Sequence, residues 1–189
     1  MKIHFDNLPG KLHEGISELS EILGIRITEG EGLQIRAIQA QGPIQVSLKD
    51  GQGTIRYQET IHFFRAMGVF LEQARERVQF ELTEEPKFDF NGTMLDVSRN
   101  GVLKVPVIKR FIRYMALMGL NGLMMYTEDT YEVKEQPYFG YMRGRYTASE
   151  MKECDDYADL FGIEMIPCIQ TLGHLQQALK WGYAADIKD

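Results

Sequence analysis

The segment Phe90–Arg99 constrains the fold of this chain most strongly, because an apolar run in it ends in charge and a helical pattern follows. The run Met94–Val97 predicts a strand buried on both faces, as parallel strands under helices are. Asp96 lies inside this run, where a carboxylate without a partner would cost on the order of several kcal/mol, so we expect it to be hydrogen-bonded. Arg99 follows where the strand would end. Spacing alone leaves two roles open for Asp96 and Arg99, a structural pair or a substrate site.

After this segment the sequence alternates between strand and helix patterns. The predicted elements are a strand at Met94–Val97, a helix at Pro106–Met118, a strand at Gly122–Tyr126, a helix at Thr147–Phe161 and a strand at Ile163–Ile169. Thr147 followed by Glu150 has the spacing of a capping box at a helix start. The alternation predicts right-handed βαβ units and a parallel sheet.

The residues before Phe90 have a different organisation. Amphipathic helices are predicted at Leu12–Leu23, closed by Gly24, and at Thr60–Glu76; the strands between them are predicted at Leu33–Ala40, Ile44–Leu48 and Gly53–Tyr57, with a turn at Asp50-Gly51. We therefore predict a small non-catalytic α+β domain with antiparallel strands over residues 1–80. Residues 81–89 are polar and contain a proline, which predicts a linker. Residues 90–189 form the α/β part.

The α/β part is too short for a closed barrel. A (β/α)8 barrel needs roughly 200 residues or more, and about half of that follows the linker. The alternatives are a small open α/β sheet or the first three β/α units of an incomplete barrel. Three parallel strands alone would leave an apolar edge free to aggregate, which favours the incomplete (β/α)8 TIM barrel.

Composition excludes some functions. The net charge of -6 and the lack of a basic stripe argue against a nucleic-acid partner. No apolar run approaches the roughly 18 to 20 residues of a membrane span, and the first residues do not form a secretory signal, so we expect a cytoplasmic protein. Cys154 and Cys168 are too few for a disulfide framework and are expected to be reduced packing residues.

Polar residues follow all three predicted strands. Arg99 follows the first strand, Glu128 and Asp129 the second, and His174 the third. Loops at the carboxyl ends of neighbouring strands form a common pocket, so we expect these side chains to converge. Arg99 would suit hydroxyls or a carboxylate, and Glu128 or Asp129 would fix the tautomer of His174. The alternatives are a solvated loop for the acidic pair and a structural role for His174.

Neither Glu128 nor Asp129 is assigned as a general acid. Adjacent carboxylates suggest acid catalysis, but no neighbouring residue would separate their pKa values. His174 and the nearby acids are too few and too irregularly spaced for a zinc site. We predict no metal and no cofactor.

Several motifs occur in a specific order over Asn91–Trp181. They are Leu95–Arg99, Thr127–Asp129, Tyr146–Met151, Tyr157-Ala158, Gly162-Ile163 and Leu172–His174. The series resembles the start of the barrel of glycoside hydrolase family 20, the β-N-acetylhexosaminidases. The preceding unit resembles the non-catalytic domain commonly found before that barrel.

The resemblance implies a (β/α)8 glycosidase that removes terminal non-reducing N-acetyl-β-D-hexosamine with retention. The substrate's own acetamide oxygen would act as the nucleophile. Arg99 matches the arginine that grips the 3- and 4-hydroxyls, and His174 matches the histidine of the third-strand motif. Glu128 falls at the acidic residue that pairs with this histidine. Asp96 matches a buried aspartate of the first strand and is expected to give structural support.

Two further residues are expected on the same sugar-binding face. Asp129 lies beside Glu128, and Trp181 is expected near the rim of the pocket. The partner would thus be a glycan that ends in N-acetylhexosamine.

The chain also departs from the family pattern. Glu128 stands where the family usually has Asp, Gln170 where it has an acidic residue, and Met124–Tyr126 where it often has His-Trp-His. The family's catalytic Asp-Glu pair ends the fourth strand, and no Asp-Glu dipeptide occurs in this sequence. We therefore expect no catalytic residue in this chain, which would supply part of the sugar-binding face while a second polypeptide completes the barrel. The alternatives are a non-catalytic sugar-binding or regulatory α/β module, or another sugar-cleaving barrel with a similar first half.

Overall fold

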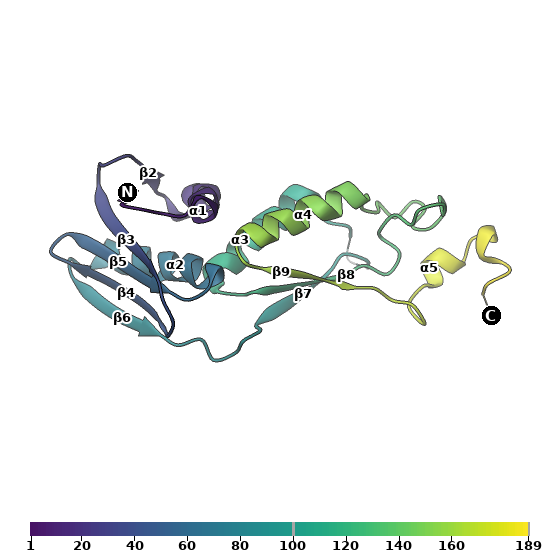
Figure 1. Ribbon diagram of the computed structural model, residues 1–189. Helices are drawn as coiled ribbons and strands as arrows, with labels where there is room; N and C mark the ends of the chain where they lie inside the picture. Colours follow the sequence, from purple (N-terminus) through teal and green to yellow (C-terminus); the bar gives the residue numbers. More distant parts are fainter. Residues whose placement is uncertain (100, 189) are drawn as a thin grey trace.

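The computed structural model describes residues 1–99 and 101–188, in which strands form two sheets lying end to end (Figure 1). The first sheet has the strand order β2-β1-β3-β5-β4-β6. Its strands are β1 Lys2–Phe5, β2 Arg26–Ile27, β3 Leu33–Gln39, β4 Ile44–Lys49, β5 Gln52–Tyr57 and β6 Phe80–Glu84. Helix α2 (Thr60–Glu76) packs against β4 and β5, and helix α1 (Gly10–Leu23) packs against α2.

Local signals in the sequence determine the ends of these elements. Gly24 has φ +60° and its N–H bonds the carbonyls of Ser20 and Glu21, which ends α1 as predicted. Asp50 and Gly51 both have positive φ, as the tight turn between β4 and β5 requires. Helix α2 has the predicted bounds.

The predicted antiparallel arrangement is only partly right. Strands β4 and β5 form an antiparallel hairpin, but β3 pairs with β5 in parallel and β1 pairs with β3 in parallel. The hairpin leaves the other edge of β5 to β3, so β3 does not pair with the strand that follows it in sequence. This pairing is non-local, and the periodicity of each strand does not encode it.

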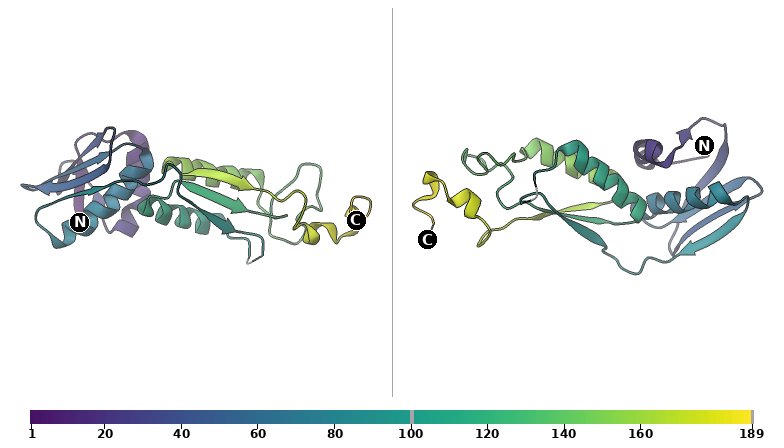
Figure 2. Two further views of the ribbon diagram at one scale, coloured as in Figure 1. Left: turned by 90° about the horizontal axis from the view of Figure 1, so that it is seen from below. Right: turned by 180° about the vertical axis from the view of Figure 1, so that it is seen from behind.

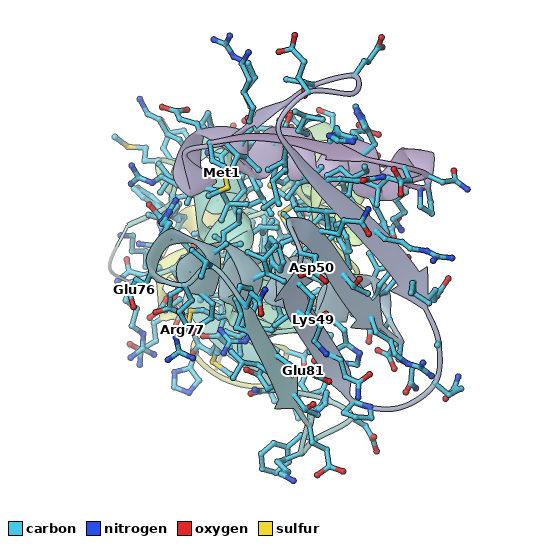
Figure 3. The ribbon with its side chains drawn as sticks, turned by 90° about the vertical axis from the view of Figure 1, so that its left-hand side faces the viewer. Met1, Lys49, Asp50, Glu76, Arg77 and Glu81 are labelled. Atoms are coloured by element: carbon cyan, nitrogen blue, oxygen red, sulfur yellow. The ribbon has the colours of Figure 1, made fainter. Side chains whose placement is uncertain are left out.

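The predicted linker begins too early. Residues 80–84 form β6, which pairs antiparallel with β4. Phe80 and Leu82 face the core, while Glu81 and Thr83, which alternate with them, are exposed. The polar composition of this segment therefore reflects an edge strand with one face in solvent. Lys49 and Glu81 form an ion pair across the two strands, at the end of the sheet shown in Figure 3.

The second sheet contains the parallel strands β7 (Gly92–Asp96), β8 (Gly122–Tyr126) and β9 (Glu164–Cys168), in that order. Helices α3 (Val105–Met118) and α4 (Ala148–Leu160) cover one face of it (Figures 1 and 2). The predicted βαβ pattern is confirmed, and so is the capping box of Thr147 and Glu150. The chain then continues through α5 (Gln176–Leu179) and a 3-10 turn, η1 (Gly182–Ala184).

The expectation that the first parallel strand is buried on both faces is wrong. Leu95 packs toward the helices, but Met94 on the opposite face is 56% exposed. Met94 is in register with Met124 and Ile166, which form one row across the sheet. No described element covers this second face, and both views in Figure 2 show it open.

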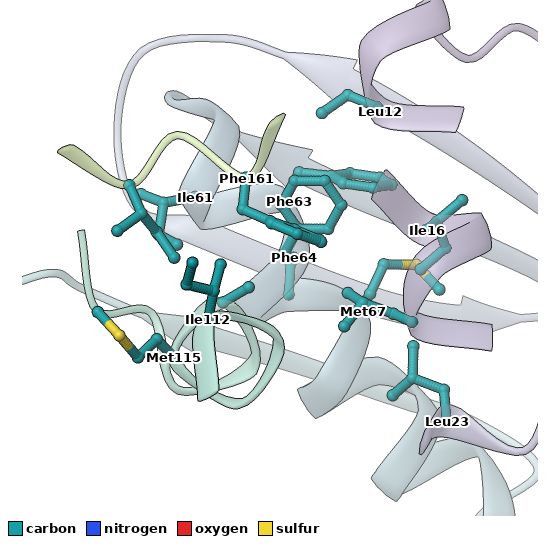
Figure 4. Close-up of a cluster of buried hydrophobic side chains, with 14 of the residues drawn as sticks. Leu12, Ile16, Leu23, Ile61, Phe63, Phe64, Met67, Ile112, Met115 and Phe161 are labelled. Carbon is teal, nitrogen blue, oxygen red and sulfur yellow. The ribbon is translucent and has the colours of Figure 1, made fainter. Parts of the chain in front are cut away.

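One hydrophobic core runs through both parts of the chain. Phe64 from α2 packs against Phe161, which directly follows α4, and against its neighbour Phe63. Ile112 from α3 belongs to the same cluster (Figure 4). The segment after β6 thus separates two sheets without separating two cores. Cys154 is part of this core, and both cysteines are free thiols as expected.

The helices are short or amphipathic. Within residues 1–99 and 101–188, no helix has the length and apolar character needed to cross a membrane.

Candidate functional site

The three strand ends converge as predicted. The Arg99 Nε donates to Glu128 Oε1 at 2.8 Å, and a terminal guanidinium nitrogen of Arg99 lies 2.6 Å from His174 Nδ1. These residues come from the ends of β7, β8 and β9, which the parallel sheet places at one edge. They line a cavity of about 480 Å³ together with Arg143, Gln176 and Gln177.

The ion pair between Arg99 and Glu128 is asymmetric. The Glu128 side chain is 4% exposed, whereas that of Arg99 is 57% exposed. The hydrogen bond that Arg99 donates to Glu128 raises the pKa of the guanidinium, which therefore stays a cation. The hydroxyl of Tyr126 also donates to Glu128 Oε1, at 3.2 Å. The buried carboxylate of Glu128 thus orients the guanidinium of Arg99 at the cavity surface. The remaining N–H groups of Arg99 are free to donate to hydroxyl oxygens there.

The environment of His174 differs from the prediction. We expected Glu128 or Asp129 to bond this ring, but Arg99 lies between His174 and Glu128 and contacts both. The fork of a guanidinium reaches two acceptors, so the acid and the histidine need not touch. Because arginine only donates hydrogen bonds, His174 Nδ1 must be the acceptor and the neutral ring carries its proton on Nε2. Arg99 therefore fixes the tautomer that the sequence analysis assigned to a carboxylate.

Two residues of the site have a strained backbone. Glu128 has φ +48° and His174 has φ +58°, in the left-handed region that usually takes glycine or asparagine. For Glu128 the backbone N–H is held by the side-chain oxygen of Gln170, at 2.8 Å. Gln170 therefore connects the ends of β8 and β9 by supplying an acceptor, as an acidic residue in its place could also do.

Asp96 supports the turn that carries Arg99. Its Oδ1 accepts hydrogen bonds from Ser98 Oγ at 2.6 Å, from the Ser98 N–H at 2.8 Å and from the Arg99 N–H at 3.2 Å. These bonds, first of all that of the Ser98 side chain, lower the pKa of Asp96. The predicted partner of the carboxylate thus exists. Asp96 bonds the backbone of Arg99, while the guanidinium of Arg99 turns toward Glu128.

Asp129 is buried, with 1% of its surface exposed, and is not among the described residues that line the cavity. Its Oδ1 accepts from the Nε of Arg143 at 3.0 Å, and a terminal nitrogen of Arg143 donates to the Ser98 carbonyl at 2.8 Å. Sequence reasoning missed Arg143, because residues 132–146 have no periodic pattern and its partners are distant in sequence. Arg143, rather than Asp129, is the one that lines the cavity.

The ring of Trp181, which was expected near the rim of the pocket, packs against Tyr141. Its ring meets that of Tyr141 edge-on at 5.4 Å, and Tyr138 stacks on Tyr183 at 5.9 Å. Trp181 is not among the described residues that line the cavity. These aromatic contacts join the segment after β8 to the segment after β9.

In the described part of the chain, no three or more His, Cys, Asp or Glu side chains come together as metal ligands could.

The sequence and fold of this region match a known family. The model of the glycosyl hydrolase family 20 catalytic domain matches residues 88–188, which contain the three parallel strands and every residue of the cavity. The chain belongs to glycosyl hydrolase family 20. The resemblance inferred from the ordered motifs is therefore confirmed.

Proteins named as hexosaminidases or N-acetylglucosaminidases are also similar to the chain over a longer span. The chain is 28% identical over 165 residues to a probable beta-hexosaminidase, fdl, of Drosophila melanogaster. This alignment covers 82% of the chain and 23% of the Drosophila protein. The N-acetyl-beta-hexosaminidase of Streptomyces plicatus superposes with a TM-score of 0.74 at 23% identity over 94% of this chain and 43% of that one. The family 20 exo beta-N-acetylglucosaminidase of Vibrio harveyi, solved in complex with N-acetylglucosamine, gives a TM-score of 0.73 at 19% identity over 94% and 34%. The chain thus has an α/β fold found in family 20 and spans less than half of each of these proteins.

Proposed function

We propose that this chain forms the first three β/α units of a (β/α)8 barrel and part of the face that holds a terminal N-acetylhexosamine. The observation that carries the proposal is the position of Arg99. Its guanidinium donates hydrogen bonds to buried Glu128 and to His174 Nδ1, while more than half of the side chain remains exposed at the cavity. The names of the hexosaminidases that the chain resembles support the same substrate class.

The chemistry of the cavity suits the edge of a pyranose. Adjacent sugar hydroxyls present two oxygen acceptors side by side, and a planar guanidinium presents donors with matching spacing. His174 adds the Nε2–H donor that its tautomer leaves available, and Gln176 and Gln177 add amides that both donate and accept. These residues can bind and orient a sugar, but none of them is placed as a general acid.

We propose that hydrolysis requires the remaining barrel units. In this proposal the acetamide oxygen of the substrate attacks the anomeric carbon with retention, and the general acid comes from outside these 189 residues, on a polypeptide that completes the barrel. The uncovered row of Met94, Met124 and Ile166 supports completion, because the interior of such a barrel is filled by side chains from all its strands.

Sugar binding by the 189-residue chain tests the first part. The ¹⁵N-labelled chain is titrated with N-acetylglucosamine and, as a matched control, with glucose, while amide and side-chain signals are followed by NMR. We expect millimolar binding of N-acetylglucosamine that shifts the Gln176, Gln177 and Arg99 side-chain signals and is lost in Arg99→Met. Shifts that are absent from these side chains, or that persist in Arg99→Met, would refute the assignment of the cavity.

An assay of the assembled protein tests the second part. Intact mass under denaturing conditions shows whether the purified protein contains a second polypeptide, and an aryl N-acetyl-β-glucosaminide and the aryl β-glucoside then test for hydrolysis. Release from the first substrate alone supports the proposal. Hydrolysis by the 189-residue chain alone would contradict the view that the general acid lies elsewhere.

A further inference from the structure

Arg143 connects the two strand ends that carry the central ion pair of the cavity. It lies in the segment between β8 and α4, and its side chain is 23% exposed. The Nε donates to Asp129 Oδ1 at 3.0 Å and a terminal nitrogen donates to the Ser98 carbonyl at 2.8 Å. The first contact is at the end of β8 and the second is at the end of β7. One guanidinium therefore spans the two strand ends.

These contacts are adjacent in sequence to the ion pair itself. Ser98 directly precedes Arg99, and Asp129 directly follows Glu128. The Arg99–Glu128 hydrogen bond, at 2.8 Å, therefore lies between backbone segments that Arg143 holds together. Because the Arg99 side chain is largely exposed, few packing contacts restrict it, and its direction depends on how its backbone sits relative to Glu128.

The burial of Asp129 makes this contact specific. The carboxylate is 1% exposed and its Oδ2 has no hydrogen-bond partner among the described residues, so Arg143 supplies its counter-charge. A buried charge retains its position only when it is paired. Gly140 allows the segment to approach this closely, because a Cβ there would collide with the Asp129 carbonyl oxygen.

We propose that Arg143 is a positioning residue of the sugar site, which holds Arg99 and Glu128 in register through Ser98 and Asp129. The inference rests on the proposed sugar-binding function of the cavity. Arg143 acts through the backbone of its neighbours, so its loss should release the Arg99 guanidinium without removing any group assigned to bind sugar hydroxyls.

The test uses the ¹⁵N-labelled 189-residue chain and a double variant. Arg143→Met alone would leave Asp129 as a buried unpaired anion and could unfold the chain, so Asp129→Asn is added to remove that charge. The readout is hydrogen exchange of the Arg99 Nε–H, which Arg99→Lys assigns by loss of its signal. We expect exchange to rise about tenfold in the double variant, since protection of an N–H follows the stability of its hydrogen bond. N-acetylglucosamine binding should weaken in parallel while circular dichroism stays unchanged.

Two further variants separate the positioning role from general effects. Lys134→Met removes an exposed cation from the same segment and should change neither exchange nor binding. Arg143→Lys keeps the charge beside Asp129 but lacks the planar fork, so it should raise Arg99 exchange by less than the double variant does. It also replaces the double variant if that protein does not fold.

The outcomes distinguish this inference from the proposed function. A folded variant whose Arg99 Nε–H exchanges as in the wild type would overturn the positioning role. Faster exchange with unchanged N-acetylglucosamine affinity would also overturn it, because Arg99 would then be released without consequence for the sugar. If the wild-type chain binds no N-acetylglucosamine, the proposed function fails, whereas the exchange experiment still reports whether Arg143 holds Arg99.

Discussion

Phe161 offers the most direct test of the core that joins the two sheets. It follows α4 in the parallel-sheet part and is fully buried. Its ring packs edge-on against Phe64 of α2, with 5.0 Å between centroids, and against Tyr157 at 5.3 Å. Gly15 of α1 lies close by, since a Cβ there would be 3.5 Å from the Phe161 ring. Phe161→Ala therefore opens a cavity lined by helices of both parts.

The expected loss of stability in Phe161→Ala follows from the burial of the ring and from the cavity that its removal leaves. Truncation of a fully buried phenylalanine costs about 3–5 kcal/mol, which includes the transfer of the ring and the cavity that remains. The aromatic pair contributes about 0.5–1.5 kcal/mol of this. Domains of this size have a free energy of unfolding of about 5–15 kcal/mol, so the variant should be folded but much closer to unfolding. Phe161→Leu, which keeps most of the volume, should lose much less.

Urea unfolding followed by two probes measures this loss. Far-ultraviolet circular dichroism reports both sheets, and fluorescence of Trp181, the single tryptophan, reports the parallel-sheet part. We expect coincident transitions in the wild type and a lower midpoint for Phe161→Ala by both probes. Phe88→Ala, at a side chain 73% exposed, is the matched control and should change stability by less than about 0.5 kcal/mol. A loss below about 1 kcal/mol for Phe161→Ala, or transitions that separate, would refute a shared core.

Three further predictions concern single groups. Hydrogen bonds hold the pKa of Asp96 below its ordinary value of 3.8, so its stabilisation is complete above that pH and is lost as pH falls through the folded-state pKa. Asp96→Asn should therefore lower the urea midpoint near neutral pH but barely change it in strong acid, and a pH-independent difference would contradict this. Burial raises the pKa of the Cys154 thiol to about 11, so we expect it to react with Ellman's reagent only on unfolding, as thiol counts with mass mapping would show. Gly140→Ala should destabilise the chain in urea more than Gly144→Ala, because both have positive φ but only Gly140 lies against the Asp129 carbonyl; equal losses would exclude that contact.

The sequence predicted the site's main residues but not how they connect. Arg99, Glu128 and His174 each follow a predicted strand, so their convergence follows from a parallel sheet. The order of contacts does not, because it depends on the reach and direction of side chains. The sequence pattern therefore could not predict that Arg99 lies between Glu128 and His174 and contacts both.

Residues whose partners are far apart in sequence were missed altogether. Arg143 lies in a segment without periodic pattern and meets Ser98 and Asp129 only after the chain has folded. The sequence likewise did not predict that the polar segment after Phe80 pairs with β4. An edge strand with one face in solvent has as many polar residues as a linker, so composition does not distinguish the two.

The amino-acid sequence by itself determined the longer helices α1 to α4, with ends within about two residues of those observed, and the parallel strands, as well as the place of the protein in glycosyl hydrolase family 20. Those features depend on contacts within a turn or a strand and on short ordered motifs, which local residue patterns encode directly. The tertiary structure alone decided that β3 pairs with β5, that one core spans both sheets, and that Arg143 holds the two strand ends together. These depend on which surfaces and side chains meet across long stretches of chain, and that follows from packing and charge in three dimensions.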